Sequence, residues 1–200
     1  METISSNRPK IVVIGSCNTD MVVKANRLPV PGETILGGTF YMNPGGKGAN
    51  QAIAAARLGA EVTFISKIGY DLFGLQALEI YRSEKINTEF IFTDQKSPSG
   101  VALISVDSFG ENSIIVAPGA SRSLSTEDIN KAEEKIKEAD IILMQLEVPI
   151  DTVEYAATIA NRYGKKVILN PAPASTLSNS FLNNVHTILP NAIRNKSNGC

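Results

Sequence analysis

Apolar and polar positions follow two alternating patterns along the second part of the chain, from residue 126 onward. Segments with apolar residues at helical spacing predict helices, and short β-branched runs between them predict buried strands. The helices are expected over 126–138, 150–163 and about 177–184, and the strands over 139–147, 165–171 and 185–191. Because helices and strands alternate, the pattern predicts parallel strands with crossover helices, which is an α/β fold covered on both faces.

The first part of the chain mixes this pattern with a second kind of strand. Strands over 10–15 and 62–68 and helices over 47–58 and 71–83 fit the same core. Strands over 21–26 and 34–41, and a hairpin formed by 100–106 and 113–117, have a more polar alternation. Strands buried on both faces do not alternate in this way, so these segments predict a small accessory sheet that projects from the core.

The composition excludes several classes of function. Of 200 residues, 43% are hydrophobic, and 19 basic residues nearly balance 20 acidic ones, so no basic excess favours nucleic acid as a partner. The apolar runs are strand-sized, which predicts no membrane span, and the N-terminus lacks a signal-peptide core. Two cysteines, Cys17 and Cys200, cannot define a disulfide framework, so we expect a reducing, cytoplasmic location.

The stretch PGGKGANQ at 44–51 places Lys47 between glycines just before a predicted helix. Glycines let backbone approach a ligand, and a helix N-terminus offers free N–H groups, so Lys47 and Asn50 can face one ligand. The alternative is a tight turn with a solvated lysine. A Walker A loop is excluded because Gly48 follows the lysine, and a dinucleotide fingerprint is excluded because Gly15 stands alone after the first strand.

Polar side chains follow the apolar strands of the predicted core. Asn18 and Asp20 follow the first strand, and Glu147, Asn170 and Asn191 lie at the ends of three later strands. Because ligands collect beyond the carboxyl ends of parallel strands, these residues are expected on one rim beside the glycine loop. A rim rich in amides and carboxylates, without clustered cations, suits a neutral polyol or sugar. The alternatives are an Asx turn at Asn18 and solvation of Glu147 beyond its strand.

Other catalytic patterns are missing from the sequence. The single histidine, His186, lies inside a predicted strand, which favours a structural role, and no Ser-His-Asp set can be formed. No Cys/His cluster predicts a zinc site. The candidate chemistry therefore rests on the polar rim.

Six motifs occur in order between residues 10 and 191: GSCNTD, LPVPGET, PGGKGANQA, GYDLFG, LMQLE and LNPAPA. Together they resemble the PfkB family of sugar kinases, and its members that phosphorylate D-ribose more than those acting on fructose, ketodeoxygluconate or adenosine. The resemblance implies transfer of the γ-phosphoryl group of ATP to the 5-hydroxyl of D-ribose. It also implies a requirement for Mg²⁺ and activation by a monovalent cation, K⁺.

The same resemblance implies roles for individual residues. The implied sugar-binding residues are Asn18, Asp20, Gly46, Lys47, Asn50 and Glu147, and Asn191 is implied to lie toward the ATP phosphates. Strands within about 20–42 and 99–118 are implied to form a β lid over the sugar, through which two subunits pair as a homodimer. The fold expected for residues 1–200 is thus a mostly parallel α/β sheet flanked by helices, with a small β lid.

The sequence departs from the family pattern near its C-terminal end. An N-x-x-E motif is expected at Asn191, but Arg194 stands in place of the glutamate, and no stretch resembles the D-T-x-G-A-G-D motif that carries the family's catalytic aspartate. We therefore expect that the C-terminal part is missing, that no catalytic base or metal ligand is present, and that this chain alone has little kinase activity. An unfinished sheet edge and poor solubility are expected too.

Two other functions fit the same residues. One is another PfkB sugar kinase, such as one acting on deoxyribose, because pockets that differ by a single hydroxyl contact are hard to tell apart from sequence. The other is a non-catalytic fragment that binds a sugar or forms a dimer.

Overall fold

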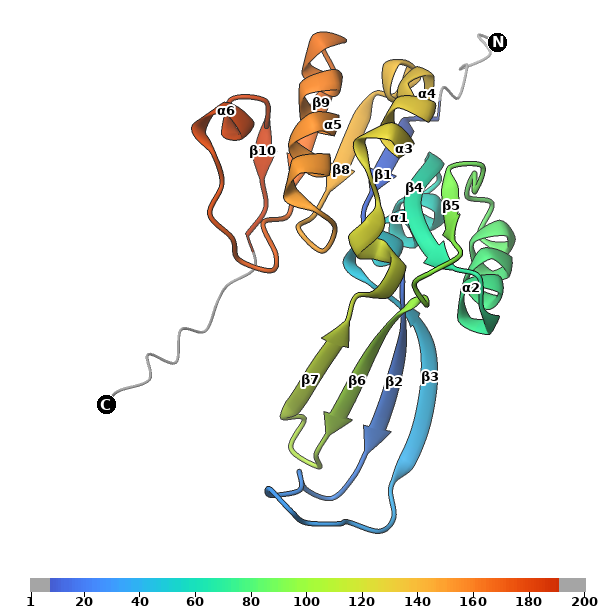
Figure 1. The fold of residues 1–200 in the computed structure, drawn as a ribbon, viewed down its shortest axis with the longest axis vertical. Coiled ribbons are helices and arrows are strands. Elements are labelled where there is room, and N and C mark those ends of the chain that lie inside the picture. Colours follow the sequence, from blue (N-terminus) through green and yellow to red (C-terminus); the bar gives the residue numbers. More distant parts are fainter. Residues whose placement is uncertain (1–7, 191–200) are drawn as a thin grey trace, which may run out of the picture.

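The computed structural model describes residues 8–190, and its core is a six-stranded sheet (Figure 1). The strands lie in the order β10-β9-β8-β1-β4-β5, and every neighbouring pair is parallel. Their bounds are Lys10–Ile14 (β1), Glu61–Gly69 (β4), Ile91–Asp94 (β5), Ile141–Met144 (β8), Lys166–Leu169 (β9) and Thr187–Ile188 (β10). The parallel pairing confirms the predicted α/β fold.

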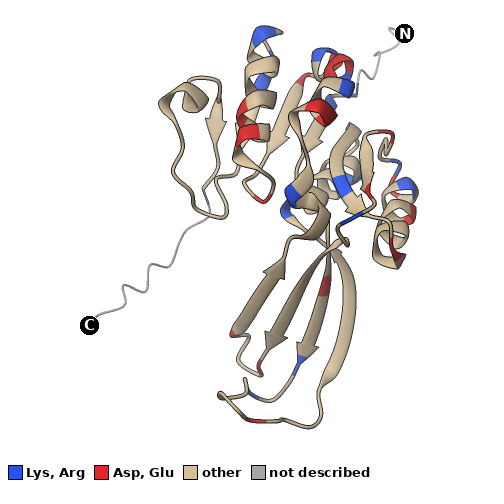
Figure 2. Cartoon of the chain, viewed as in Figure 1, with Lys and Arg blue, Asp and Glu red and all other residues tan. Residues whose placement is uncertain are grey.

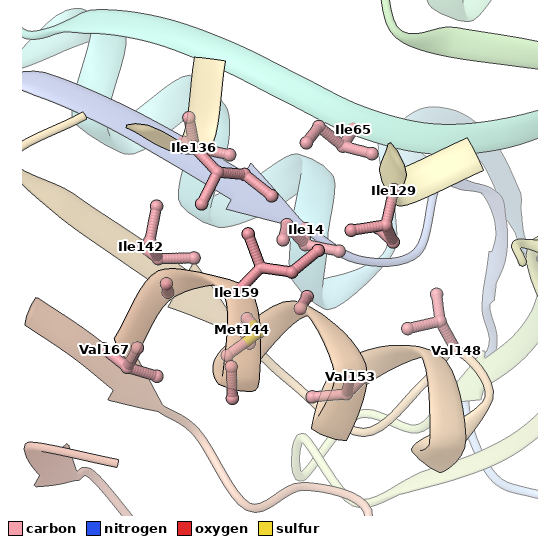
Figure 3. Close-up of a cluster of buried hydrophobic side chains, with 14 of the residues drawn as sticks. Ile14, Ile65, Ile129, Ile136, Ile142, Met144, Val148, Val153, Ile159 and Val167 are labelled. Carbon is pink, nitrogen blue, oxygen red and sulfur yellow. The ribbon is translucent and has the colours of Figure 1, made fainter. Parts of the chain in front are cut away.

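Helices cover both faces of this sheet. One face carries α1 (Lys47–Arg57) and α2 (Leu72–Ser83), and the other carries α3 (Thr126–Lys131), α4 (Glu133–Glu138), α5 (Ile150–Arg162) and α6 (Asn179–Leu182). Alternate residues of β1 divide between two cores: Val12 and Ile14 pack toward α5, and Val13 packs toward α1. Figure 3 shows part of the first core, where Ile142 of β8 lies near Ile159 of α5. Burial on both faces explains the nearly continuous apolar runs of these strands.

The predicted helix over 126–138 is two short helices. Ser125 caps α3 as its spacing predicts: its hydroxyl accepts the Asp128 N–H, and the Asp128 carboxylate accepts the Ser125 N–H at 3.1 Å. The helix is interrupted at Ala132, where φ is −100° and ψ is 6°, outside the helical region. Ile129 and Ile136 are still buried on the same face, so the apolar periodicity survives the break.

A second, four-stranded sheet projects from one end of the core (Figure 1). Its order is β3-β2-β6-β7, with bounds Thr39–Gly45 (β3), Asn18–Lys24 (β2), Gly100–Val106 (β6) and Asn112–Ala117 (β7). The central pair β2 and β6 is parallel, and the outer pairs are antiparallel. β6 and β7 form the predicted hairpin, and the 3-10 helix η1 (Gly119–Ser123) leads back to the core.

Two strands of the projecting sheet begin away from their predicted positions. β2 begins at Asn18, so Asn18 and Asp20 lie within the strand and not in a turn before it. β3 begins at Thr39 instead of residue 34, because Gly37 and Gly38 have φ of 100° and 107°, which a strand does not accommodate. The short strand β5 and the helix η1 were not predicted, since neither has a clear period.

The projecting sheet is poor in charge and rich in exposed apolar side chains. In its four strands only Asp20 and Lys24 are charged, whereas charged residues are frequent on the core helices (Figure 2). The exposed large apolar residues of these strands are Val23, Phe40, Tyr41, Met42, Leu103, Ile114, Ile115 and Val116. Nothing within residues 8–190 covers these side chains fully, in contrast to those of the core sheet.

Candidate functional site

A cavity of about 140 Å³ lies where the projecting sheet meets the core. It is lined by Asn18, Asp20, Gly46, Lys47, Asn50, Ala102, Ile104, Ile114, Val116 and Glu147. Every residue that the family resemblance implies for sugar binding therefore lines one cavity. Two other positions of the predicted rim do not: Asn170 follows β9 without lining the cavity, and Asn191 lies outside the described residues.

The glycine loop packs directly on the end of β1. Gly46 has φ of 91° and stands at the N-cap of α1, and a Cβ there would lie 2.9 Å from the Ser16 carbonyl oxygen. A Cβ on Gly48 would lie 2.7 Å from the backbone of Gly15 and Ser16. This close packing lets the Ser16 carbonyl accept the Ala49 N–H at 3.0 Å. The glycines therefore serve the contact between two backbone segments, besides any contact with a ligand.

Glu147 binds the N-terminal end of α1. Its Oε2 accepts the Lys47 N–H at 2.8 Å and the Ser16 hydroxyl at 2.5 Å, and its Oε1 accepts the Lys47 ammonium at 2.5 Å. The carboxylate thus accepts the Lys47 N–H, one of the helix N–H groups that the sequence pattern left free for a ligand. It also neutralises the charge of Lys47. A site with this internal ion pair favours a neutral ligand over an anion.

The two carboxyl groups of the cavity have pKa values shifted in opposite directions. Burial opposes ionisation of Glu147, but hydrogen bonds from Lys47 and Ser16 outweigh it and lower the pKa of Glu147. Burial raises the pKa of Asp20; the charge of Glu147 adds to this rise and Lys47 opposes it. The Asp20 side chain makes no ion pair or hydrogen bond within residues 8–190, so its carboxylate is available to a ligand.

The Asn18 amide is a buried polar group of the same cavity. Its side chain is 5% exposed, and Oδ1 has no hydrogen-bond partner within the part of the chain that the structure describes. Leaving such a buried acceptor unpaired costs about 1–3 kcal/mol, and the oxygen lies against Gly100, where a Cβ would be 2.2 Å from it. Asn18 and Asp20 stand two residues apart in β2 and line the same cavity, where hydroxyl groups satisfy both.

The projecting sheet supplies an apolar wall to the cavity. Ala102 of β6 is paired with Asp20 of β2 and with Val116 of β7, and Ile104 is paired with Ile114. Directly paired residues share a face of a sheet, so these apolar side chains lie beside the polar ones. A cavity with one polar and one apolar side matches a sugar ring, which carries hydroxyls at its edge and C–H groups on its faces.

A second cavity of about 350 Å³ adjoins the first. It shares Asn18, Lys47, Val116 and Glu147 and adds Ser16, Pro118, Arg122, Leu146 and Pro173. Sequence reasoning missed Ser16 and Arg122. Ser16 precedes Asn18 in GSCNTD, so its hydroxyl at a strand end was the available signal, whereas Arg122 lies in η1, which no pattern predicted.

The remaining candidate groups have structural partners. His186 lies just before β10, and not inside the strand as predicted; its Nδ1 accepts the Val167 N–H at 3.3 Å. The Cys17 thiol lies 2.9 Å from the Tyr81 hydroxyl, and burial raises its pKa to about 11. Within residues 8–190, no three His, Cys, Asp or Glu side chains are grouped to hold a metal ion, and no helix has the length and apolarity needed to span a membrane.

The fold and the cavity define an α/β domain with a small polar and apolar pocket beneath a projecting sheet. The family description "pfkB family carbohydrate kinase" matches residues 8–193, and the chain belongs to that family.

The similar proteins within this family include enzymes named for ribose and deoxyribose. The chain is similar to ribokinase from Haemophilus influenzae, with 45% identity over 184 residues, covering 92% of this chain and 60% of the relative. It is also similar to deoxyribokinase from Salmonella typhi, with 42% identity over 164 residues, covering 82% and 54%. The structure of Arabidopsis thaliana ribokinase complexed with ribose and ATP matches with a TM-score of 0.80 at 31% identity, covering 92% of this chain and 60% of that one. The chain thus spans 60% or less of the length of these relatives.

Proposed function

We propose that this chain is the sugar-binding part of a ribokinase, which transfers the γ-phosphoryl group of ATP to the 5-hydroxyl of D-ribose. The observation that carries the proposal is the gathering of all of the implied sugar-binding residues around one cavity, in which the Asp20 carboxylate has no partner within residues 8–190. Ribokinase relatives of up to 45% identity support the choice of sugar.

Each polar lining residue has a role in the proposal. The Asn18 amide and the Asp20 carboxylate bind sugar hydroxyls, and Lys47 donates with the ammonium protons that Glu147 does not use. Glu147 presents Oε1 to the sugar while Oε2 holds the glycine loop. Asn50 is exposed on the first turn of α1 and lines the cavity, so its amide is offered to a sugar hydroxyl.

Gly46 and the projecting sheet complete the proposed pocket. Gly46 presents loop backbone to the cavity, and the lack of a side chain lets that backbone pack against Ser16. The strands within 20–42 and 99–118 act as the lid: their apolar wall covers the sugar ring and keeps water, a competing phosphoryl acceptor, away from the reaction.

ATP and Mg²⁺ belong to the donor side of the proposed reaction. When bound, Mg²⁺ neutralises charge on the ATP phosphates, and a monovalent cation such as K⁺ activates the enzyme. Residues 8–190 contain no group of three or more His, Cys, Asp or Glu side chains that could hold a metal ion, and Asn191, proposed to lie toward the ATP phosphates, is outside them. We therefore assign the donor side to sequence that corresponds to the rest of the ribokinase relatives, and expect these 200 residues alone to transfer little phosphate.

The proposal includes a homodimer formed through the lid strands. Support comes from the exposed apolar side chains of the projecting sheet, among them Phe40 at 59% and Ile115 at 69% exposed, which a second copy would cover. Light scattering after size exclusion measures the mass directly. A monomer at all concentrations up to the solubility limit would contradict this part.

A cytoplasmic location is the last part of the proposal. Its support is chemical: Cys17 is a buried free thiol, and free cysteines are usual in reducing compartments. Fractionation of the source cells, followed by detection of the chain, tests it.

Calorimetric titration of the 200-residue chain with sugars tests the proposed function. D-Ribose is expected to bind, with 2-deoxy-D-ribose and D-fructose weaker, because each changes a hydroxyl that the polar side of the cavity would meet. Tighter binding of deoxyribose would favour the deoxyribose-specific relatives instead. Absence of binding by any of these sugars to the folded chain would overturn the proposal.

A further inference from the structure

We propose that Ser16 is a positioning residue for sugar binding: its hydroxyl fixes the Glu147 carboxylate so that Oε1 and the Lys47 ammonium face the sugar together. The inference rests on the proposed function, because it names how one side of the same pocket is held in place. Ser16 is outside the set that the family resemblance implies, and it acts through Glu147.

The geometry around Ser16 is tightly determined. Its side chain is 1% exposed, and its Oγ donates to Glu147 Oε2 at 2.5 Å. Its carbonyl accepts the Ala49 N–H at 3.0 Å, an approach that the missing Cβ of Gly48 permits. Ser16 therefore joins the end of β1 to α1 through its backbone and to Glu147 through its side chain.

Counting donors and acceptors shows what this contact does. Glu147 Oε2 receives two donors, the Ser16 hydroxyl and the Lys47 N–H, and is saturated. Oε1 receives one donor, the Lys47 ammonium, and keeps one acceptor site. Without the hydroxyl, Oε2 would lose one of its two anchors and the carboxylate could rotate. The paired donor and acceptor offered to a sugar hydroxyl would then no longer be held in one orientation.

The charges around Glu147 decide how the contact responds to pH. Lys47 on α1 and Asp20 on β2 line the first cavity with Glu147, and Arg122 on η1 lines the adjoining one. The Ser16 hydroxyl stabilises the ionised carboxylate together with Lys47. Removing the hydroxyl raises the pKa of Glu147, so sugar binding should fail at a higher pH when the solution is acidified.

The test compares Ser16→Ala with Ser66→Ala in the full 200-residue chain. Ser66 is equally buried, and its hydroxyl donates to the Gly15 carbonyl at 2.7 Å, one residue before Ser16 and away from Glu147. Both variants lose one buried hydroxyl. Ser16→Cys is the further variant for the case that Ser16→Ala does not fold, because a thiol leaves no empty space at the position and is a poorer donor than a hydroxyl.

D-Ribose affinity is measured by calorimetry from pH 4 to pH 8, with circular dichroism as the check on folding. For Ser16→Ala and Ser16→Cys we expect affinity to fall by about tenfold or more at neutral pH, the cost of one charge-assisted hydrogen bond. On acidification, these variants should lose ribose binding at a higher pH than the wild type does. Ser66→Ala should bind within about threefold of the wild type, with an unshifted pH profile, since no contact with Glu147 changes.

The outcomes separate this inference from the proposed function. Wild-type binding with equal affinity and an equal pH profile in the Ser16 variants would overturn the role of Ser16 and leave the sugar site standing. Equal losses in Ser16→Ala and Ser66→Ala would also overturn it, because the effect would then be structural. Absence of ribose binding by the wild type contradicts the proposed function itself.

Discussion

The core sheet and the projecting sheet use similar apolar residues in opposite ways. In the core, Ile14 and Ile142 are fully buried between helices, whereas in the projecting sheet Ile114 and Ile115 are 52% and 69% exposed. The core sheet is all parallel, and the projecting sheet is mixed and has few charges. Apolar residues of the first kind hold the fold together, and those of the second kind are exposed, where the proposed function assigns them to a sugar or a second subunit.

The candidate site lies between the core sheet and the projecting sheet, and each of them contributes lining residues. The core contributes rigid strand and helix ends, which fix Lys47 and Glu147 by hydrogen bonds. The projecting sheet contributes Asn18 and Asp20 together with an apolar wall. The difference predicts that core substitutions change stability first, and that substitutions facing the junction change sugar binding first.

The largest expected effect is on stability, from truncating a core residue. Ile142→Ala should lower the free energy of unfolding by about 2–5 kcal/mol, since it leaves a cavity in a fully buried cluster. Ile115→Ala should lower the free energy of unfolding by less than about 1 kcal/mol, because the side chain is mostly exposed. Urea unfolding followed by circular dichroism measures both. Equal costs would show that the two sheets are not stabilised differently.

The next effect is on binding, from removing the charge of Glu147. Glu147→Gln should weaken D-ribose binding by about tenfold to a hundredfold, because Lys47 and the Ser16 hydroxyl lose their ionised partner. Glu134→Gln is the matched control, since its ion pair with Lys137 is exposed on α4. Calorimetry should show a loss of affinity for Glu147→Gln alone, and similar affinities for the two variants would contradict the proposed role of Glu147.

A smaller effect should distinguish the two faces of the projecting sheet. Ile114 lines the cavity, and its neighbour Ile115 points to the other face. Ile114→Thr should weaken ribose binding by about threefold to tenfold through lost apolar contact, and Ile115→Thr should leave it unchanged. A larger loss of ribose affinity in Ile115→Thr than in Ile114→Thr would contradict the assignment of the sugar to the face that carries Ile114.

The smallest effect concerns Asp20 and has a definite sign. Its pKa is raised in the folded chain, so its ionisation opposes folding as pH rises through the carboxyl range. Asp20→Asn should therefore raise stability slightly at neutral pH, and the gain should vanish in acid, where the native carboxyl is protonated. The same substitution should weaken ribose binding. Thermal melts at neutral and acidic pH give the sign, and a loss of stability at neutral pH would contradict the burial argument.

The core was predictable from sequence because burial on both faces leaves a strong pattern. The run KIVVIG predicts β1, and the small residues after Lys47 predict α1 within one residue of its observed end. The projecting strands were harder to bound, since their pattern is weak and Gly37 and Gly38 delay β3. A residue such as Ala132 interrupts a helix without any local signal.

The site was predictable in part, and mainly through motifs. Strand-end reasoning indicated Asn18, Asp20 and Glu147, and the glycine loop before a helix indicated Lys47 and Asn50. Both arguments left simple turns open, and the family resemblance added Gly46 and D-ribose as the sugar. The contact between Ser16 and Glu147 joins positions 131 apart in sequence, which no local pattern encodes. The occupation of the α1 N-terminus by a carboxylate of the same chain also emerges only from the packing of β8 against β1.

The measurement that tests the central claim most directly is an ¹H–¹⁵N correlation spectrum of the 200-residue chain titrated with D-ribose. The claim is that the cavity between the two sheets binds the sugar, so the signals of Asn18, Gly46, Lys47 and Asn50 should shift in a saturable way. The signal of Phe109, in the loop at the tip of the projecting sheet, should stay in place. A well-dispersed spectrum without shifts at the cavity, or with shifts at the tip alone, would contradict the claim.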